Sequence, residues 1–167
     1  MILTTAVDRE WLEPDGRGGF ASGTVAGPRT RRYHALLLTA TTPPTGRVVL
    51  VNGFDAWVET PAGRLPLTSQ RYAPDVIHPA GTDPESFTAD PWPRWVYALE
   101  GGVRVEQEIF VHRASGATCL SWRLLEGGPA ELHLRPFLSG RRHPPPPPQR
   151  GRLRFAAAAV ADPHSAR

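Results

Sequence analysis

The sequence contains no lysine, and all 19 of its basic residues are arginine. They are scattered among 16 acidic residues, so the formal net charge is only +3. This skew, together with abundant alanine, proline and glycine, is more typical of a GC-rich coding bias than of a surface that binds phosphate. Arginines cluster only at residues 29–32 and 141–154. Nucleic-acid binding is therefore a weak alternative.

Cysteine and long apolar runs are also scarce. Cys119 is the only cysteine, so no intrachain disulfide can form and a cysteine-based zinc site is not supported. The six histidines are dispersed, and we expect neither a metal nor another cofactor. No run approaches the ~20 apolar residues that a membrane span needs, and the first residues lack the features of a signal peptide. We expect a cytoplasmic protein without membrane contacts.

Proline and glycine, by contrast, number 19 and 16 and are spread along the chain. They argue against a helical bundle, because they destabilise a helix interior by about 3 and 1 kcal/mol, respectively. Apolar and polar residues alternate with a period of two at residues 103–112, 120–124 and 131–136. These patterns predict an all-β protein. The expected architecture is an antiparallel two-layer β-sandwich of the supersandwich type, incomplete at its C-terminus.

Turn signals place several connections between the strands. Asn52 and Gly53 form a strong hairpin dipeptide, which predicts a turn at this point. The glycine pair at residues 101–102 predicts another hairpin. Residues 72–93 are rich in proline and poor in aliphatic side chains, so we expect a long loop there. The strands within residues 95–136 are predicted to form one antiparallel meander with a single dry face.

The C-terminal part of the chain loses this pattern. Five consecutive prolines at residues 144–148 favour polyproline II and cannot donate to a sheet. We therefore expect residues 1–140 to form the sandwich domain and residues 141–150 to be an Arg/Pro-rich linker. Residues 151–167 are expected to be the start of a further strand or a truncated tail.

Two patterns suggest chemistry without meeting its physical requirements. Residues 16–21 fit the G-x-G-x-x-A form of a dinucleotide-binding loop, but the residues that follow are poor helix formers. We expect a glycine-rich turn there. Glu106 and Glu108 alternate on one strand at roughly 6.5–7 Å, near the separation of the two acids of an inverting glycosidase. Because they do not face each other across a cleft, we expect them to face solvent.

Aromatic residues are concentrated after the proline-rich segment. Trp92, Trp95 and Tyr97 occur within residues 92–97. Aromatic faces bind the C–H faces of sugars and also nucleobases. Trp92 breaks the alternation set by Trp95 and Tyr97 and is a candidate for contact with a sugar. Anchoring of the core or of the loop is the alternative.

The densest signal is a succession of motifs. Residues 10–12 read Glu-Trp-Leu, residues 16–24 read Gly-Arg-Gly-Gly-Phe-Ala-Ser-Gly-Thr, and residues 30–37 read Thr-Arg-Arg-Tyr-His-Ala-Leu-Leu. Residues 92–97 read Trp-Pro-Arg-Trp-Val-Tyr, and Leu-Arg-Pro follows at residues 134–136. This succession resembles the N-terminal domain of the bacterial and archaeal glycogen debranching enzymes, over most of the chain.

The resemblance implies a β-rich sandwich that precedes a catalytic (α/α) barrel. The family cleaves α-1,6 branch linkages in glycogen-like glucans, and its catalytic carboxylates lie in the barrel, which this chain does not contain. No catalytic residue is therefore assigned to the chain. The sequence departs from the family pattern at two places: Ala35 replaces a glycine, and a basic residue replaces an acid within residues 139–143.

The resemblance also implies that residues 30–34 face the glucan or the barrel. Arginine and histidine can donate hydrogen bonds to sugar hydroxyls, and tyrosine offers a stacking face. An equal alternative is that these residues only pin the glycine-rich loop and a domain interface. A further alternative is a free-standing carbohydrate-binding module. The residues that we predict to bind α-glucan are Arg31, Arg32, Tyr33, His34 and Trp92.

Overall fold

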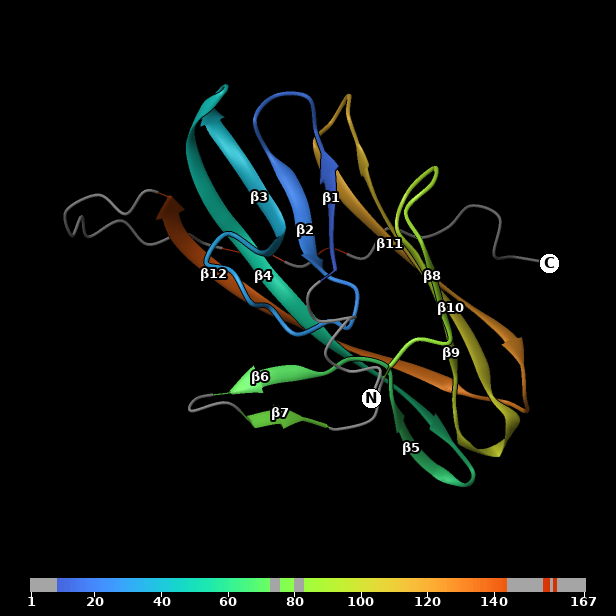
Figure 1. The fold of residues 1–167 in the computed structure, drawn as a ribbon. Helices are drawn as coiled ribbons and strands as arrows, with labels where there is room; N and C mark the ends of the chain where they lie inside the picture. Colours follow the sequence, from blue (N-terminus) through green and yellow to red (C-terminus); the bar gives the residue numbers. More distant parts are fainter. Residues whose placement is uncertain (1–8, 73–75, 80–82, 144–154, 157, 159–167) are drawn as a thin grey trace.

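The computed structural model describes residues 9–72, 76–79, 83–143, 155–156 and 158 (Figure 1). Nearly all of its regular structure consists of strands, which pair antiparallel in two main sheets and a small hairpin. The prediction of an all-β antiparallel sandwich is confirmed. Nothing helical within the described residues has the length and apolar character that crossing a bilayer requires.

The larger sheet has six strands in the order β1-β2-β3-β4-β12, with β5 added beside β4. Its longest strand, β4, pairs with β12 along most of one edge and with β3 and β5 at the two ends of its other edge. β4 is therefore the strand that links the other parts of this sheet. The strands are β1 (Glu10–Pro14), β2 (Phe20–Thr24), β3 (Ala35–Thr42), β4 (Thr45–Thr60), β5 (Gly63–Pro66) and β12 (Glu131–His143).

The smaller sheet has the order β11-β10-β9-β8 and lies on the right of Figure 1. Its strands are β8 (Ser86–Thr88), β9 (Arg94–Ala98), β10 (Arg104–His112) and β11 (Ala117–Glu126). The 3-10 turn η1 (Glu100–Gly102) joins β9 to β10, as the predicted hairpin requires. A separate hairpin consists of β6 (Gln70–Tyr72) and β7 (Val76–His78).

The core lies between the two main sheets. Trp11 of β1 meets Trp95 of β9 edge to face, with ring centroids 5.5 Å apart. Phe54 of β4 meets Trp122 of β11 in the same manner at 5.6 Å. Burial of each large apolar side chain stabilises the fold by roughly 1.5–3 kcal/mol. Further buried members are Leu36, Val58, Leu67, Tyr97, Val105 and Ile109.

The predicted meander is wrong at its last strand. β8, β9, β10 and β11 pair in sequence order, but the chain then crosses to the larger sheet, where β12 pairs with β4. An alternating pattern shows that one face of a strand is buried. The pattern is the same whichever of the two sheets the strand belongs to. The sequence pattern therefore could not decide the partner of β12.

β12 also extends beyond the expected domain boundary. Arg141 and Arg142 pair with Val49 and Val48 of β4, so the strand continues to His143. The expected linker at residues 141–150 is therefore wrong for its first three residues, because backbone pairing with β4 continues there. Residues 144–154 lie outside the described residues, as does most of the expected tail.

The hairpin turn predicted at Asn52 and Gly53 is wrong, because β4 runs straight through both residues. The guanidinium of Arg29 occupies the space where a Cβ of residue 53 would stand. Arg29 donates a hydrogen bond to Oε1 of Gln70 at 3.1 Å and lies over the ring of Phe137. Gly53 therefore leaves room for the close approach of the Arg29 side chain and does not form a turn.

The segment expected to be a long loop, residues 72–93, contains two short strands. β7 pairs with β6, and β8 pairs with β9. Phe87 of β8 packs its ring 5.1 Å from that of Trp95. Three-residue strands carry too short a pattern for periodicity to reveal them. The loop prediction is thus wrong where tertiary contacts impose pairing, and residues 73–75 and 80–82 lie outside the described residues.

The sandwich is uncovered along β12. Leu132 and Leu134 of β12 are 41% and 43% exposed, although their partners on β4, Val58 and Ala56, are 3% and 2% exposed. In the part that the structure describes, β12 and β11 each form an edge of their sheet. Apolar side chains at this opening therefore remain in contact with solvent.

The glycine-rich segment forms the turn of the β1–β2 hairpin, as expected, and no helix follows it. Oδ1 of Asp15 accepts hydrogen bonds from the backbone N–H groups of Arg17 and Gly19, at 2.6 and 2.8 Å. A Cβ on Gly19 would lie 2.7 Å from the carbonyl oxygen of Leu38 and would touch the carboxylate of Asp15. This turn therefore packs directly on the backbone of β3.

We expect Gly19→Ala to lower the free energy of unfolding by about 1–3 kcal/mol, because the added methyl group meets backbone that cannot move aside cheaply. Gly128→Ala is the matched control, since a Cβ at that position has no heavy atom within 4 Å. The control should stay within about 0.5 kcal/mol of the wild type. Urea unfolding of the three proteins measures both values, and equal stability of the two variants would refute this packing argument.

Candidate functional site

The loop that joins β2 to β3, residues 25–34, is anchored by its last residue. The side chain of His34 is buried, and its Nδ1 accepts hydrogen bonds from the backbone N–H groups of Thr30 and Arg31, both at 3.3 Å. Because Nδ1 accepts, the proton of the neutral ring is on Nε2. Nε2 lies 3.3 Å from Oε1 of Glu10, so the imidazole ties the loop to β1.

Glu10 is the acidic residue that Arg31 and His34 both contact. The guanidinium of Arg31 hydrogen-bonds the carboxylate and lowers the pKa of Glu10, and His34 acts in the same direction. Burial lowers the pKa of His34, and the adjacent carboxylate opposes this effect only in part. His34 is therefore a neutral donor at neutral pH.

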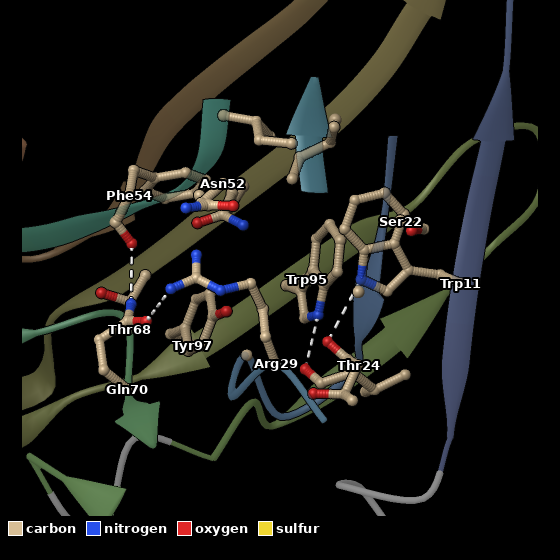
Figure 2. Close-up of a pocket in the computed structure, with 17 residues that line it drawn as sticks. Trp11, Ser22, Thr24, Arg29, Asn52, Phe54, Thr68, Gln70, Trp95 and Tyr97 are labelled. Atoms are coloured by element: carbon tan, nitrogen blue, oxygen red, sulfur yellow. Dashed lines mark hydrogen bonds between the residues drawn. The ribbon is translucent and has the colours of Figure 1, made fainter. Parts of the chain in front are cut away.

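Two tryptophans fix the other end of the loop. The indole N–H of Trp11 donates to the carbonyl of Thr24 at 3.2 Å, and that of Trp95 donates to the carbonyl of Val25 at 2.9 Å (Figure 2). The hydroxyl of Thr24 donates to the carbonyl of Pro28 at 2.6 Å. Four sequence motifs thus meet in one unit. We call it the motif junction, and it consists of Glu10, Trp11, Thr24, His34 and Trp95.

The motif junction turns three neighbouring side chains toward solvent. Arg31, Arg32 and Tyr33 are exposed, and the ring of Tyr33 stands edge-on to the buried His34. The carbonyl of Arg32 accepts a hydrogen bond from the guanidinium of Arg141 on β12. The basic segment that departs from the family pattern therefore holds this loop from the opposite edge of the sheet.

A small cavity lies between the two sheets beside the motif junction. Its volume is about 60 Å³, and its polar lining includes Ser22, Arg29, Asn52 and Gln107 (Figure 2). Burial lowers the pKa of Arg29. Ligand pockets usually measure about 300–1,000 Å³, so this cavity is too small for a sugar. Its size suits a few water molecules that hydrogen-bond the polar groups.

A larger depression, of about 380 Å³, lies on the outer face of the larger sheet beside the β6–β7 hairpin. We call it the outer groove. Sequence reasoning missed it, although Asp55 and Trp57 alternate with the buried residues of β4 and so were predictable as outward-facing. The residues that define it here are Asp55, Trp57, Arg64, Tyr72, His78 and Arg135.

A family model described as glycogen debranching enzyme N terminal matches residues 9–154. The chain belongs to this family. The match includes every segment of the motif junction, so the residues that carry the sequence resemblance are those that organise the loop. No curated protein sequence and no solved structure matches the chain significantly.

In this debranching-enzyme domain, Trp92 is placed apart from residues 31–34. Trp92 precedes β9 of the smaller sheet, where it is half-buried and packs on Phe110 with ring centroids 5.4 Å apart. Partial burial opposes ionisation of Glu108, but the hydrogen bond and the positive charge of Arg94 outweigh it and lower the pKa of this carboxyl. The predicted binding residues therefore belong to two separate regions.

Glu106 and Glu108 lie side by side in an ion-pair cluster on the outer face of the smaller sheet. Arg94 contacts Glu108 at 2.8 Å, and Arg123 contacts Glu106 at 2.6 Å. Glu106 is 9% exposed, so the expectation that it faces solvent is wrong, because the neighbouring arginines cover it. The described residues include no group of three His, Cys, Asp or Glu side chains that could hold a metal.

The buried His34 predicts a specific pH dependence of stability. Its pKa in the folded state lies below the ordinary value of 6.5, so the unfolded chain binds a proton more readily than the folded chain. The stabilisation is complete above pH 6.5 and is lost as the pH falls below that value toward the folded-state pKa.

We expect His34→Gln to lack this part of the pH dependence, even if its stability at pH 8 is lower. The matched control is His112→Gln, which removes an exposed histidine and should keep the wild-type slope. Urea unfolding at several values from about pH 5 to pH 8 measures the slopes. An unchanged slope in His34→Gln would show that this imidazole does not remain neutral in the folded domain.

Proposed function

We propose that the chain acts as the non-catalytic N-terminal domain of a glycogen debranching enzyme of the amylo-α-1,6-glucosidase type. In this role it binds α-glucan and supports the active-site cleft of a catalytic (α/α) barrel. Membership of the glycogen debranching enzyme N-terminal family supports this proposal. The single free cysteine, Cys119, fits the cytoplasmic location that we also propose.

The observation that carries the proposal is the way in which buried His34 orders an exposed loop. His34 and Glu10 fix the backbone of residues 30–34, while Arg31, Arg32 and Tyr33 remain accessible. Guanidinium groups donate to sugar hydroxyls, and a tyrosine ring packs against the C–H face of a sugar. A preorganised loop loses less conformational entropy on binding. These features suit a wall of a glucan-binding cleft.

We expect the double variant Arg32→Ala/Tyr33→Ala to bind glycogen about five- to tenfold more weakly, because roughly 1–1.4 kcal/mol of contacts is lost. Affinity electrophoresis in gels that contain glycogen measures the change. Arg113→Ala removes an exposed arginine from the β10–β11 turn and is the control. If the glycogen gel retards the double variant as strongly as the wild type, the loop is not part of the proposed glucan site.

We also expect the purified chain to release no reducing sugar from branched glucan. Glycosidic hydrolysis uses two carboxyl groups that flank the scissile bond, whereas Glu106 and Glu108 are adjacent on one strand and are paired with arginines. A reducing-sugar assay with pure protein tests this expectation. Release that is abolished by Glu106→Gln or Glu108→Gln would contradict the non-catalytic role.

A further inference from the structure

The outer groove is built on rigid structure. Its floor is the outward-facing side of β4, which is paired on both sides by β5 and β12. Tyr72 and His78 of the β6–β7 hairpin form a wall of the groove. The volume of about 380 Å³ falls within the range of about 300–1,000 Å³ that is typical of ligand pockets. The groove is therefore large enough for a ligand, unlike the cavity between the sheets.

Both arginines that line the outer groove are ion-paired. Asp55 pairs with Arg135, and Glu59 pairs with Arg64 at 2.9 Å, so each cation has its own carboxylate. The groove thus offers both hydrogen-bond donors and acceptors, and its arginines already have carboxylate partners. Such a lining fits a neutral polyhydroxyl ligand, because each hydroxyl group can both donate and accept a hydrogen bond.

The aromatic side chains of the outer groove have different roles. Trp57 is held in place by three contacts. Its ring stacks on that of His133 with centroids 5.2 Å apart, and the guanidinium carbon of Arg64 lies 4.8 Å from the centroid of its ring. Its Nε1 donates a hydrogen bond to Glu59 at 3.2 Å. Both faces of Trp57 are therefore occupied. Tyr72, on the β6–β7 hairpin, is 51% exposed and offers its ring to a ligand. The groove thus combines a fixed aromatic side chain on its floor with an accessible aromatic ring on the hairpin.

We propose that the outer groove binds a neutral sugar unit of an α-glucan, with Tyr72 as the stacking surface and Asp55 and Arg135 as partners for the hydroxyls. This inference rests on the proposed function and extends it, because it assigns a second contact with the glucan to residues other than 31–33. The site combines an aromatic ring with paired donors and acceptors, which is the arrangement that binds the apolar face and the polar rim of a sugar together.

Titration of the full chain with maltoheptaose, followed by calorimetry and by NMR of the tryptophan indole N–H signals, tests the groove directly. The Trp57 signal is assigned by its loss in Trp57→Phe, and we expect it to shift on addition of maltoheptaose. Tyr72→Ala should weaken binding about fivefold or more, whereas Tyr72→Phe should stay within about twofold because the ring remains. Phe155→Ala, which removes another exposed aromatic ring, should bind as the wild type does.

The possible results separate the groove from the function on which it rests. If the wild type binds maltoheptaose, Tyr72→Ala binds equally well and the Trp57 signal is unmoved, the groove proposal is overturned while the proposed glucan-binding function stands. If the wild type does not bind, both are overturned. A shift of the Trp57 signal with inorganic phosphate but not with maltoheptaose would show an anion site and would also overturn the groove proposal.

Discussion

The contact between Trp11 and Trp95 joins the two sheets, and the rest of the structure depends on it. The rings meet edge to face in the core, and their N–H groups donate to the consecutive carbonyls of Thr24 and Val25. A buried N–H that loses its partner destabilises a protein by about 1–3 kcal/mol. The backbone at residues 24–25 is therefore held in place where the β2–β3 loop begins. One pair of side chains thus couples sheet packing to the position of a surface loop.

The other end of that loop depends on a neutral histidine. His34 satisfies two backbone N–H groups with one nitrogen and contacts Glu10 with the other, so its side chain is used entirely within the protein. These contacts hold the backbone of the segment that carries Arg31 and Tyr33. Ala35, which replaces a glycine of the family pattern, is fully buried beside Leu38 and Val49. The substitution is thus accommodated in the packing of β3.

Local pattern predicted the strands better than their partners. The alternation at β10 and β12 identified both strands, but only long-range pairing shows that β12 belongs to the sheet of β4. Asn52 and Gly53 have the composition of a turn, yet Arg29 from a distant loop occupies the space that glycine leaves. The outer groove escaped sequence reasoning because Trp57 and Tyr72 belong to segments that show no common motif.

The sequence by itself determined the all-β class and, through motifs in a fixed order, the family to which the chain belongs. Both follow from local properties, namely the period-two alternation of side chains and the identity of neighbouring residues. Only the tertiary structure decided which motif residues point inward, as His34 does, and which remain accessible, as Tyr33 does. It alone also brought Asp55, Tyr72 and Arg135 to one groove. These features depend on pairing and burial between segments far apart in the chain, and local pattern does not specify such partners.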